Sequence, residues 1–254
     1  MRFKDQVALI TAAGSGIGRA TAEIIGGEGG IVVGVDTDEG RLKAVVEAIR
    51  GAGGTAHSRR ADALDAGQVE NLVAGVVRDL GRVDILVNAV GGSTIIPRPG
   101  ATVDELTLAE WQRLIAFNLD GTFLFCHAVA PVMKRQRGGK IVNISSVAGR
   151  GLSASSSSAY AAAKGGIIAF TRKLAHELGP FGVTVNAIAP SLTLTERIRP
   201  RWNERTAEEQ AQEVARTPLR RVADARDQAR VICFLASHDA DFVTGVTIDV
   251  TGGV

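Results

Sequence analysis

The sequence predicts an α/β protein built on one doubly wound sheet of seven parallel strands, with helices on both faces of the sheet. Three observations favour this class. Short apolar runs alternate with helical patterns from one end of the chain to the other. A glycine-rich turn follows the first apolar run, and a carboxylate ends the second. Neighbouring residues alternate little in polarity within most runs, as in strands that are covered on both sides.

Length and composition allow one domain, residues 1–254. The chain has 254 residues and is 45% hydrophobic, which is enough for a single large core. Its net charge of +2 comes from 29 basic and 27 acidic residues that are interspersed along the chain. No polyanion-binding surface is implied, so nucleic acid is not an expected partner.

Cysteine and histidine are too few and too scattered to predict a disulfide framework or a metal site. Cys126 and Cys233 lie in apolar helical patterns without C-x-x-C spacing, and we interpret them as small buried residues of a reducing compartment. No apolar stretch approaches the length of a membrane span, so we expect a cytoplasmic protein with no membrane partner. The histidines are His57, His127, His176 and His238.

The first strand, 6–11, runs into a glycine-rich turn that is typical of a dinucleotide site. Three glycines alternate with other residues in this turn, and a helical pattern starts at once. Bare backbone lets phosphates approach, and a helix N-terminus presents free N–H groups and a positive dipole. A tight strand-to-helix turn is the alternative when such a match stands alone. The predicted cofactor-binding residues of this turn are Gly14, Ser15, Gly16, Ile17 and Gly18.

The second strand, 31–35, ends in Asp36. A carboxylate at this place can accept hydrogen bonds from both ribose hydroxyls of adenosine and would repel a 2′-phosphate. Ser15 and Thr37 nearby are not basic. We therefore predict NAD as the cofactor in preference to NADP. The alternative is that Asp36 caps the next helix, although Asp38 is better placed for that role.

The remaining elements follow in the same alternating order. A loop with two prolines, 91–104, is long for its place and lies at the expected substrate end of the sheet. The long helix after it contains Asn118, a poor helix former among apolar neighbours. The further strands are expected at 55–61, 83–89, 139–146, 182–190 and 243–250, and the further helices at 42–50, 69–80, 107–135, 158–178 and 225–236.

Tyr160 and Lys164 are the strongest candidates for catalysis. Tyr160 is the only tyrosine, and residues four apart on a helix lie on one face. A phenol titrates at about 10, but a fixed positive charge beside it lowers its pKa and lets it act as a general acid or base. An isolated Y-x-x-x-K is more often an ordinary exposed pair. Here a buried-strand pattern ends just upstream in Ser146, with Ser145 as the weaker candidate, and could bring a serine to the phenol.

With these motifs in order, the chain resembles the short-chain dehydrogenase/reductase family over essentially its whole length. The resemblance implies a Rossmann-type fold and catalytic roles for Ser146, Tyr160 and Lys164. It also implies that Asn118 distorts its helix so that an ordered water links the lysine to solvent; a satisfied core amide is the alternative. The gap from Ser146 to Tyr160 is 160 − 146 = 14 residues, one more than is usual in the family, so the loop 153–158 is expected to bulge.

The resemblance extends to further cofactor contacts. It implies that Asp62, after the third strand, meets the edge of the adenine. It also implies that Asn88, at the end of the fourth, belongs to the cofactor site; the alternative is that Asn88 stabilises the centre of the sheet. After the sixth strand, the family's turn holds the nicotinamide carboxamide, which implies roles for Pro190, Thr193 and Thr195. The chain departs from the family pattern at Ala12, Ala89 and Ser191.

The segment after this turn is strongly charged. Residues 196–221 contain 12 charged side chains, which favours a mobile, solvated helical lid at about 191–221. The alternative is that some of its arginines bind a carboxylate or phosphate on the substrate. The arginines concerned are Arg197, Arg199, Arg201 and Arg205.

The sequence therefore predicts an NAD-dependent oxidoreductase. It would move a hydride between nicotinamide and the reacting carbon of a small secondary alcohol or ketone. A reductase of 3-oxoacyl thioesters is the chemical alternative, and an inactive nucleotide-binding sensor or scaffold is the alternative of another class. The resemblance also implies a homotetramer, paired through the helices 107–135 and 158–178 and the C-terminal strand.

Overall fold

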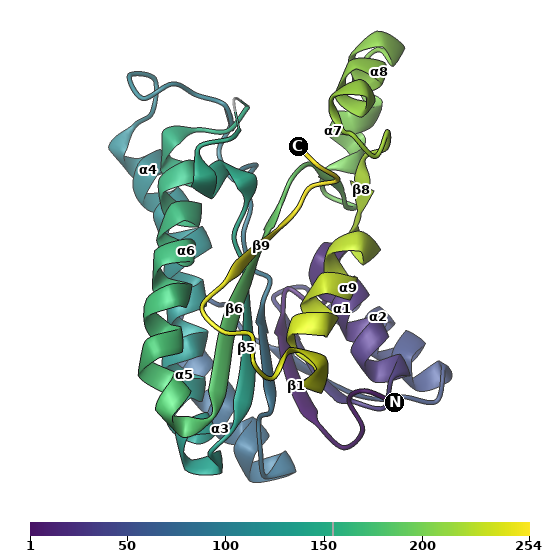
Figure 1. The fold of residues 1–254 in the computed structure, drawn as a ribbon, viewed down its shortest axis with the longest axis vertical. Helices are drawn as coiled ribbons and strands as arrows, with labels where there is room; N and C mark the ends of the chain where they lie inside the picture. Colours follow the sequence, from purple (N-terminus) through teal and green to yellow (C-terminus); the bar gives the residue numbers. More distant parts are fainter. Residues whose placement is uncertain (154) are drawn as a thin grey trace.

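The computed structural model describes residues 1–153 and 155–254. Its strands are β1 (Val7–Thr11), β2 (Ile31–Asp36), β3 (Thr55–Arg60), β4 (Ile85–Asn88), β5 (Gly139–Ile144), β6 (Val183–Pro190), β7 (Thr193–Leu194), β8 (Ala223–Asp224) and β9 (Thr247–Val250). Seven of these form one parallel sheet in the order β3-β2-β1-β4-β5-β6-β9 (Figure 1). This sheet confirms the predicted fold class.

Helices cover both faces of the sheet. They are α1 (Gly16–Gly27), α2 (Glu39–Gly51), α3 (Ala66–Leu80), α4 (Leu108–Ile115), α5 (Gly121–Gln136), α6 (Ser158–Leu178), α7 (Arg199–Asn203), α8 (Ala207–Arg216) and α9 (Ala225–Leu235). Helices α1, α2 and α9 pack on one face, and α3, α5 and α6 pack on the other (Figure 1). Shorter helical segments are a π-helical one at Ala116–Asp120 and 3-10 turns at Val147–Arg150, Gly179–Phe181 and His238–Ala240.

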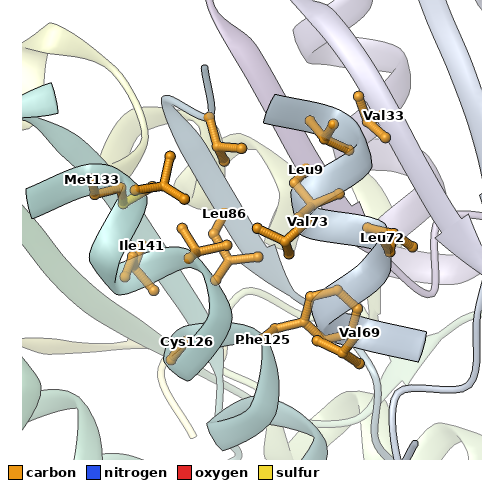
Figure 2. Packing of buried hydrophobic residues seen from close by; sticks show 14 of the residues in the cluster. Leu9, Val33, Val69, Leu72, Val73, Leu86, Phe125, Cys126, Met133 and Ile141 are labelled. Carbon is orange, nitrogen blue, oxygen red and sulfur yellow. The ribbon is translucent and has the colours of Figure 1, made fainter. Parts of the chain in front are cut away.

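Two apolar clusters fill the spaces between the sheet and these helices. In one cluster Leu9 and Leu86 of the strands meet Val73 of α3 and Phe125 of α5 (Figure 2). The other cluster joins the opposite face of the same strands, including Ile10, to α1, α2 and α9. Each fully buried side chain of this size contributes about 1.5–3 kcal/mol. Burial on both faces explains why the strand sequences are apolar without alternation.

The order of the strands reverses at β1. Leu9 pairs with Val33 of β2 on one side and with Leu86 of β4 on the other. The connections that follow β1 and β4 therefore leave in opposite directions, which opens a crevice at the C-terminal ends of the strands. Ligands of doubly wound sheets bind at this place.

Helices α4 and α5 and the π-helical segment between them form one continuous helix, Leu108–Gln136. By length and composition this helix could cross a membrane, whereas from the sequence we expected no apolar stretch that approaches the length of a membrane span. Its inner residues Leu114, Phe125 and Val129 are, however, fully buried in the protein core. A core helix meets the same criteria of length and composition, so this feature does not indicate a membrane protein.

The last strand is shorter than predicted. Pairing with β6 was expected from Val243 but begins at Thr247. The backbone N–H of Val243 bonds instead to the carbonyl of Ala240, and Gly245 turns the chain with a φ of +73°. A left-handed residue interrupts an extended strand, and glycine adopts that conformation without strain.

Between β6 and α9 the chain projects from the body of the molecule (Figure 1). Strands β7 and β8 form a small parallel sheet at the base of this projection, and α7 and α8 lie beyond it. Helix α8 has no buried residue, and it begins with a capping box formed by Thr206 and Glu209. This helix stabilises its own end and buries little of its surface.

Candidate active site

A pocket of about 680 Å³ lies at the C-terminal ends of the strands, where the strand order reverses. It is lined by the glycine turn, by the ends of β2, β4, β5 and β6, and by residues 190–198. Its volume is typical of a small-molecule site. The predicted residues that line it are Ser15, Gly16, Ile17, Gly18, Asp36, Asp62, Ser146, Tyr160, Lys164, Pro190, Thr193 and Thr195; Gly14, Asn88 and Asn118 do not.

The glycine turn brings α1 close to the end of β1. A Cβ on Gly18 would lie 2.4 Å from the carbonyl oxygen of Ala12, so only glycine fits there. Gly16 begins α1 with a φ of +56°. Ala12, where the resembled family has glycine, also has a left-handed backbone, with a φ of +49°. An alanine in this conformation costs about 1–2 kcal/mol.

Gly14 does not line the pocket, although the sequence predicted that it binds the cofactor. It is buried and its N–H donates to the Asp36 carboxylate at 3.0 Å. A Cβ on Gly14 would lie 2.9 Å from the same carboxylate oxygen. Gly14 therefore positions Asp36, which also accepts a hydrogen bond from the N–H of Asp38 at 3.1 Å. The cap of α2 is Asp38, as the sequence favoured.

The adenosine end of the pocket also contains a cation that sequence reasoning missed. Arg41 lines the pocket and forms an ion pair with Asp38 at 3.1 Å. Its position in the first turn of the helix after Asp36 is the signal that could have found it. Asp62 lies exposed at this end, and its carboxylate accepts a hydrogen bond from the N–H of Leu64 at 2.9 Å.

Tyr160 and Lys164 lie on the same face of α6, as their spacing predicted. The Lys164 Nζ is 5.8 Å from the centre of the Tyr160 ring. Lys164 is 2% exposed, and its ammonium donates to the carbonyl of Ile144 at the end of β5, at 2.8 Å. Tyr160 packs against a small apolar cluster formed by Ile96, Leu114 and Ala159. The two side chains are thus fixed by the packing of α6 on the sheet.

The electrostatics of this pair differ from the prediction. Burial raises the pKa of the Tyr160 phenol, while the Ser146 hydroxyl and the Arg197 guanidinium act in the opposite direction. Lys164, which was expected to lower the phenol pKa, is not among these influences. Burial, and then repulsion from Arg197, lowers the pKa of Lys164 to about 7. The sequence spacing could not show this because desolvation depends on the packed structure.

The two serines at the end of β5 have different surroundings. Ser145 is 2% exposed, and its hydroxyl donates to the backbone carbonyl of Lys164 at 2.8 Å. Both serines line the pocket, but Ser146 is only partly buried, and its hydroxyl accepts from the N–H of Ala148 at 3.2 Å. The geometry therefore favours Ser146 as the serine that faces a substrate. The expected bulge at 153–158 includes residue 154, which lies outside the described residues.

Asn118 lies in the π-helical segment and is fully buried. Its side chain accepts from the N–H of Gly92 at 2.8 Å and donates to the carbonyls of Gly92 and Leu114. The amide thus fastens the loop after β4 to a distorted helix, and a π-helical segment often marks a functional site. The structure agrees with part of each interpretation of Asn118. The helix is distorted at this residue, and the side-chain amide has hydrogen-bond partners inside the protein.

Asn88 does not line the pocket, contrary to its predicted place in the cofactor site, and instead stabilises the centre of the sheet, which was the alternative. It is 2% exposed in the middle of the sheet, and its Nδ2 donates to Asn143 at 2.9 Å. The neighbouring Ala89 does line the pocket, but its N–H donates to the Thr11 hydroxyl at 2.9 Å. A position at the end of a strand predicts that a residue lies near the ligand, but the side chain of Asn88 is hydrogen-bonded to Asn143 of the neighbouring strand β5.

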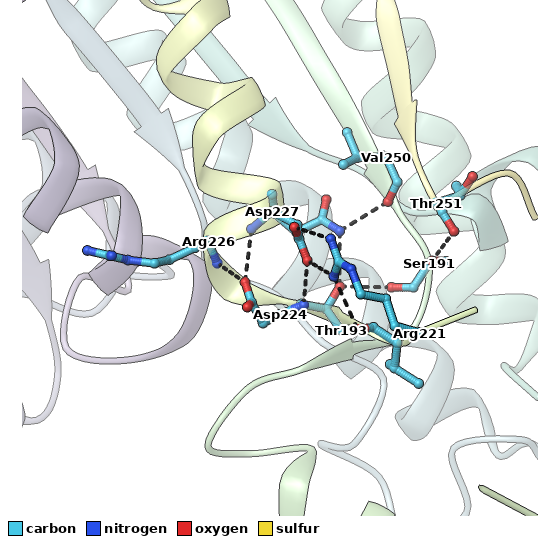
Figure 3. Close-up of polar contacts among 10 residues, drawn as sticks. Ser191, Thr193, Arg221, Asp224, Arg226, Asp227, Val250 and Thr251 are labelled. Carbon is cyan, nitrogen blue, oxygen red and sulfur yellow. Dashed lines mark hydrogen bonds and ion pairs between the residues drawn. The ribbon is translucent and has the colours of Figure 1, made fainter. Parts of the chain in front are cut away.

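A polar network anchors the base of the projecting segment (Figure 3). The Thr193 hydroxyl donates to the carbonyl of Ser191 at 3.1 Å and accepts from Gln228 of α9 at 3.2 Å. Arg221 forms an ion pair with Asp227, whose own N–H donates to the Asp224 cap of α9. Thr193 therefore has a structural role in addition to lining the pocket.

Glu196 and Arg197 extend from this anchored base into the pocket and were not predicted individually. The Glu196 carboxylate accepts a hydrogen bond from the N–H of Gly16 at 2.8 Å. The Arg197 Nη2 donates to the carbonyl of Gly91 at 2.7 Å. Thr195, just before them, lies against the glycine turn, because a Cβ on Gly16 would be 3.2 Å from its methyl group. Segment 195–197 thus bridges the glycine turn and the loop after β4.

The pocket fits a nicotinamide dinucleotide. A carboxylate already sits on the first free amide of α1, at Gly16, which shows that this helix end holds an anionic oxygen. Asp36 stands at the end of β2 for the ribose, and the absence of side chains at Gly16 and Gly18 leaves the backbone bare. Among residues 1–153 and 155–254, no group of three or more His, Cys, Asp or Glu side chains could hold a metal ion.

Fold and pocket together define a dinucleotide-binding protein with a tyrosine and a lysine beside the site. A family model described as enoyl-(acyl carrier protein) reductase matches residues 11–254. The short-chain reductase protein NovJ of Streptomyces niveus is 39% identical over 257 residues, which cover 98% of this chain and 94% of that protein. The (2S)-[(R)-hydroxy(phenyl)methyl]succinyl-CoA dehydrogenase subunit BbsD of Thauera aromatica is 37% identical over 253 residues, covering 100% and 98%.

A solved structure extends the likeness to three dimensions. The 3-oxoacyl-[acyl-carrier protein] reductase from Brucella melitensis with bound NAD matches with a TM-score of 0.88 at 36% identity, over 100% of this chain and 92% of that one. The chain belongs to the short-chain dehydrogenase/reductase family of oxidoreductases. Members of this family use nicotinamide cofactors.

Proposed function

We propose that this protein is an NAD-dependent oxidoreductase that interconverts a secondary alcohol and a ketone, with Tyr160 as the general acid and base. The observation that carries the proposal is the convergence of Ser146, Tyr160 and Lys164 on the pocket that the glycine turn opens. Two elements that follow one another in the chain, the end of β5 and helix α6, bring a hydroxyl, a proton donor and an ammonium to one place. Bound NAD would supply the carbon that accepts or returns the hydride.

The residues of the site have separable roles in this proposal. Ser146 hydrogen-bonds the oxygen of the substrate and holds it near the phenol. Tyr160 donates a proton to that oxygen in reduction and accepts it in oxidation. Because burial raises the pKa of the phenol, it keeps its proton at neutral pH, the form needed to reduce a carbonyl. Lys164 holds the end of β5 through Ile144, and Asn118 fixes the loop at Gly92.

The preference for NAD rests on Asp36. Its carboxylate faces the pocket at the end of β2, where a 2′-phosphate would meet a like charge. Arg41 lies at the same end, but its guanidinium pairs with Asp38. The balance of two carboxylates against one guanidinium supports NAD. Comparing the dissociation constants for NADH and NADPH tests this preference.

A reductase of 3-oxoacyl thioesters is the second candidate. It is supported by the Brucella reductase and by the family model, both of which are described as acting on carrier-protein substrates. The projecting helices α7 and α8 could contact such a carrier. Higher kcat/KM for acetoacetyl-CoA than for simple ketones, together with a preference for NADPH, would favour this candidate.

We further propose a homotetramer that works in the cytoplasm and binds neither nucleic acid nor membrane. Exposed aromatic side chains support the assembly: Trp111 is 37% exposed on α4 and Phe123 is 47% exposed on α5. Exposed large apolar side chains are typical of a protein interface when they gather on one surface. Sedimentation velocity of the purified protein tests the assembly, and a monomer would refute it.

The activity is tested by a screen of secondary alcohols and ketones with NAD(H) and NADP(H), followed through the absorbance of reduced nicotinamide. The proposal expects turnover of several simple substrates with NAD(H). An inactive nucleotide-binding sensor or scaffold would instead bind NAD and turn over nothing in the screen.

A further inference from the structure

The four arginines that follow the turn after β6 differ in whether they line the pocket. Arg199 and Arg201 are exposed and do not line the pocket. Arg205 pairs with Glu213 at 3.4 Å and lies over the ring of Trp202. Arg197 is exposed as well, but it alone of the four lines the pocket. Of the four arginines that could bind a substrate anion, only Arg197 is therefore placed to do so in the pocket.

The Arg197 guanidinium lies at the catalytic end of the pocket. Its Nη2 donates to the carbonyl of Gly91 at 2.7 Å, and a Cβ on Gly92 would lie 2.5 Å from the same nitrogen. The position of a Cβ on Gly91 is 2.8 Å from both the Lys164 Nζ and the Asn118 Oδ1. The loop after β4 thus has the guanidinium and the ammonium as close neighbours, beside the phenol.

This guanidinium has no acidic partner among the residues that the structure describes. The adjacent carboxylate, Glu196, is bonded to the N–H of Gly16 and lies 3.9 Å from Arg19. In the part of the chain that the structure describes, the side-chain hydrogen bond from Arg197 goes to a neutral carbonyl. Although the Arg197 side chain is exposed, repulsion from its charge contributes to the lowered pKa of the buried Lys164. Within residues 1–153 and 155–254, no carboxylate pairs with either of these two cations, and an incoming anion would relieve the repulsion between them.

We propose that Arg197 binds a carboxylate of the substrate, so that the preferred substrates are hydroxy acids and oxo acids with the carboxylate close to the reacting carbon. This inference rests on the proposed oxidoreductase function and deepens it. The planar guanidinium can hold a carboxylate through two parallel hydrogen bonds. When the carboxylate binds Arg197, the reacting oxygen is directed toward Tyr160 and Ser146.

A phosphate of the cofactor is the other anion that Arg197 could bind in place of a substrate carboxylate. The two sources differ in place, because the anion-binding amide of the glycine turn is at Gly16, whereas Arg197 bonds to Gly91 beside Lys164. The position beside the catalytic residues favours the substrate as the source. Direct binding measurements for each source then separate them.

The kinetic test compares acids with their own methyl esters. Acetoacetate and methyl acetoacetate, and levulinate and methyl levulinate, are reduced with NADH by wild type, Arg197→Met, Arg197→Lys and Arg199→Met. We expect Arg197→Met to lower kcat/KM for the acids by roughly 10- to 150-fold and to change that for the esters little. Arg197→Lys should retain part of the preference, and Arg199→Met all of it. Equal losses for acids and esters, or no loss, would overturn the inference.

The binding test does not depend on turnover. Titration calorimetry measures malonate binding to each variant saturated with NADH, and NADH binding to each variant alone. We expect malonate to bind wild type and Arg199→Met equally and Arg197→Met at least about 10-fold more weakly, with NADH affinity nearly unchanged. Equal malonate affinity in all variants, no malonate binding by wild type, or a loss confined to NADH would overturn the inference. Malonate binding without turnover of any ketone would count against the proposed function only.

Discussion

The carboxylate of Glu196 accepts a hydrogen bond from the backbone N–H of Gly16, 180 residues earlier in the chain, at 2.8 Å. Through this contact a side chain of the projecting segment occupies the helix end that the glycine turn offers to a phosphate. Arg19 lies 3.9 Å from the same carboxylate and helps to hold it. A ligand that places an anion on Gly16 must therefore displace Glu196.

Glu196→Gln should bind the cofactor more tightly. The neutral amide competes less well for the positive end of the α1 dipole, and a charge at a helix N-terminus contributes about 0.3–1 kcal/mol. We expect the dissociation constant of NAD to fall by roughly 2- to 5-fold, measured by titration calorimetry. Glu204→Gln, in the same segment but away from the turn, serves as the control. An unchanged or weaker affinity in Glu196→Gln would show that the contact does not compete with the cofactor.

Asp36→Asn should reduce the discrimination between NAD and NADP. The amide loses the charge that accepts ribose hydroxyls, and it no longer repels a 2′-phosphate that Arg41 could then approach. We expect NADH to bind roughly 10-fold more weakly or worse and NADPH to bind more tightly. Fluorescence titration of both reduced cofactors measures the change, and thermal unfolding checks that the Gly14 turn survives. If the ratio of the two affinities stays the same, Asp36 does not select the cofactor.

The buried ammonium of Lys164 should make stability depend on pH. Its pKa is lowered to about 7 in the folded protein, first by burial and then by Arg197, whereas the unfolded chain keeps the ordinary value near 10.5. Between these values the unfolded chain binds more protons, so this residue raises the free energy of unfolding as pH increases from about 7. Its slope approaches about 1.4 kcal/mol per pH unit.

Lys164→Met removes this titration while keeping most of the volume. Urea unfolding of wild type and Lys164→Met between pH 6 and pH 9 should give a difference in stability that shifts in favour of wild type as the pH rises, on the order of 1 kcal/mol per unit. In Arg197→Met the rise should begin at higher pH, because the repulsion from the guanidinium is gone. A difference between wild type and Lys164→Met that is constant over this range would contradict the lowered pKa.

Ala12→Gly should stabilise the fold. Ala12 has a φ of +49°, and glycine removes the strain at this position at the cost of greater freedom in the unfolded chain. The net gain is expected to be about 0.5–1 kcal/mol by thermal or urea unfolding. Ala13→Gly is the matched control, since Ala13 is buried beside it without a positive φ and should lose stability. Destabilisation of Ala12→Gly would show that the alanine is not strained.

The sequence predicted the sheet and its helices because their signals are local. Apolar runs, glycine turns and capping residues such as Asp38 each act within a few residues of themselves. The same locality explains the errors. The spacing of the glycines does not reveal that the Gly14 N–H bonds to Asp36. The position of Asn88 at the end of a strand does not reveal that its side chain bonds to the neighbouring strand.

The site was predicted less completely than the fold because its chemistry depends on distant contacts. Spacing identified Tyr160 and Lys164 on one face of α6, but burial, which decides their pKa values, follows from packing. The sequence treated Glu196 only as one charge of a solvated segment, and it could not distinguish Arg197 from the three other arginines that were candidates for binding an anion. Their positions become visible once the segment is folded back onto the glycine turn and the loop after β4.

Tyr160→Phe tests the central claim most directly. It removes one oxygen, the proposed proton donor, and leaves the packing against Ile96 and Leu114 in place. The measurement is kcat for a ketone that wild type reduces with NADH, together with the dissociation constant of NADH for both proteins. We expect kcat to fall by about 10²- to 10⁴-fold while NADH affinity is retained. A variant that reduces the ketone at a rate close to wild type would contradict the assignment of Tyr160 as the acid.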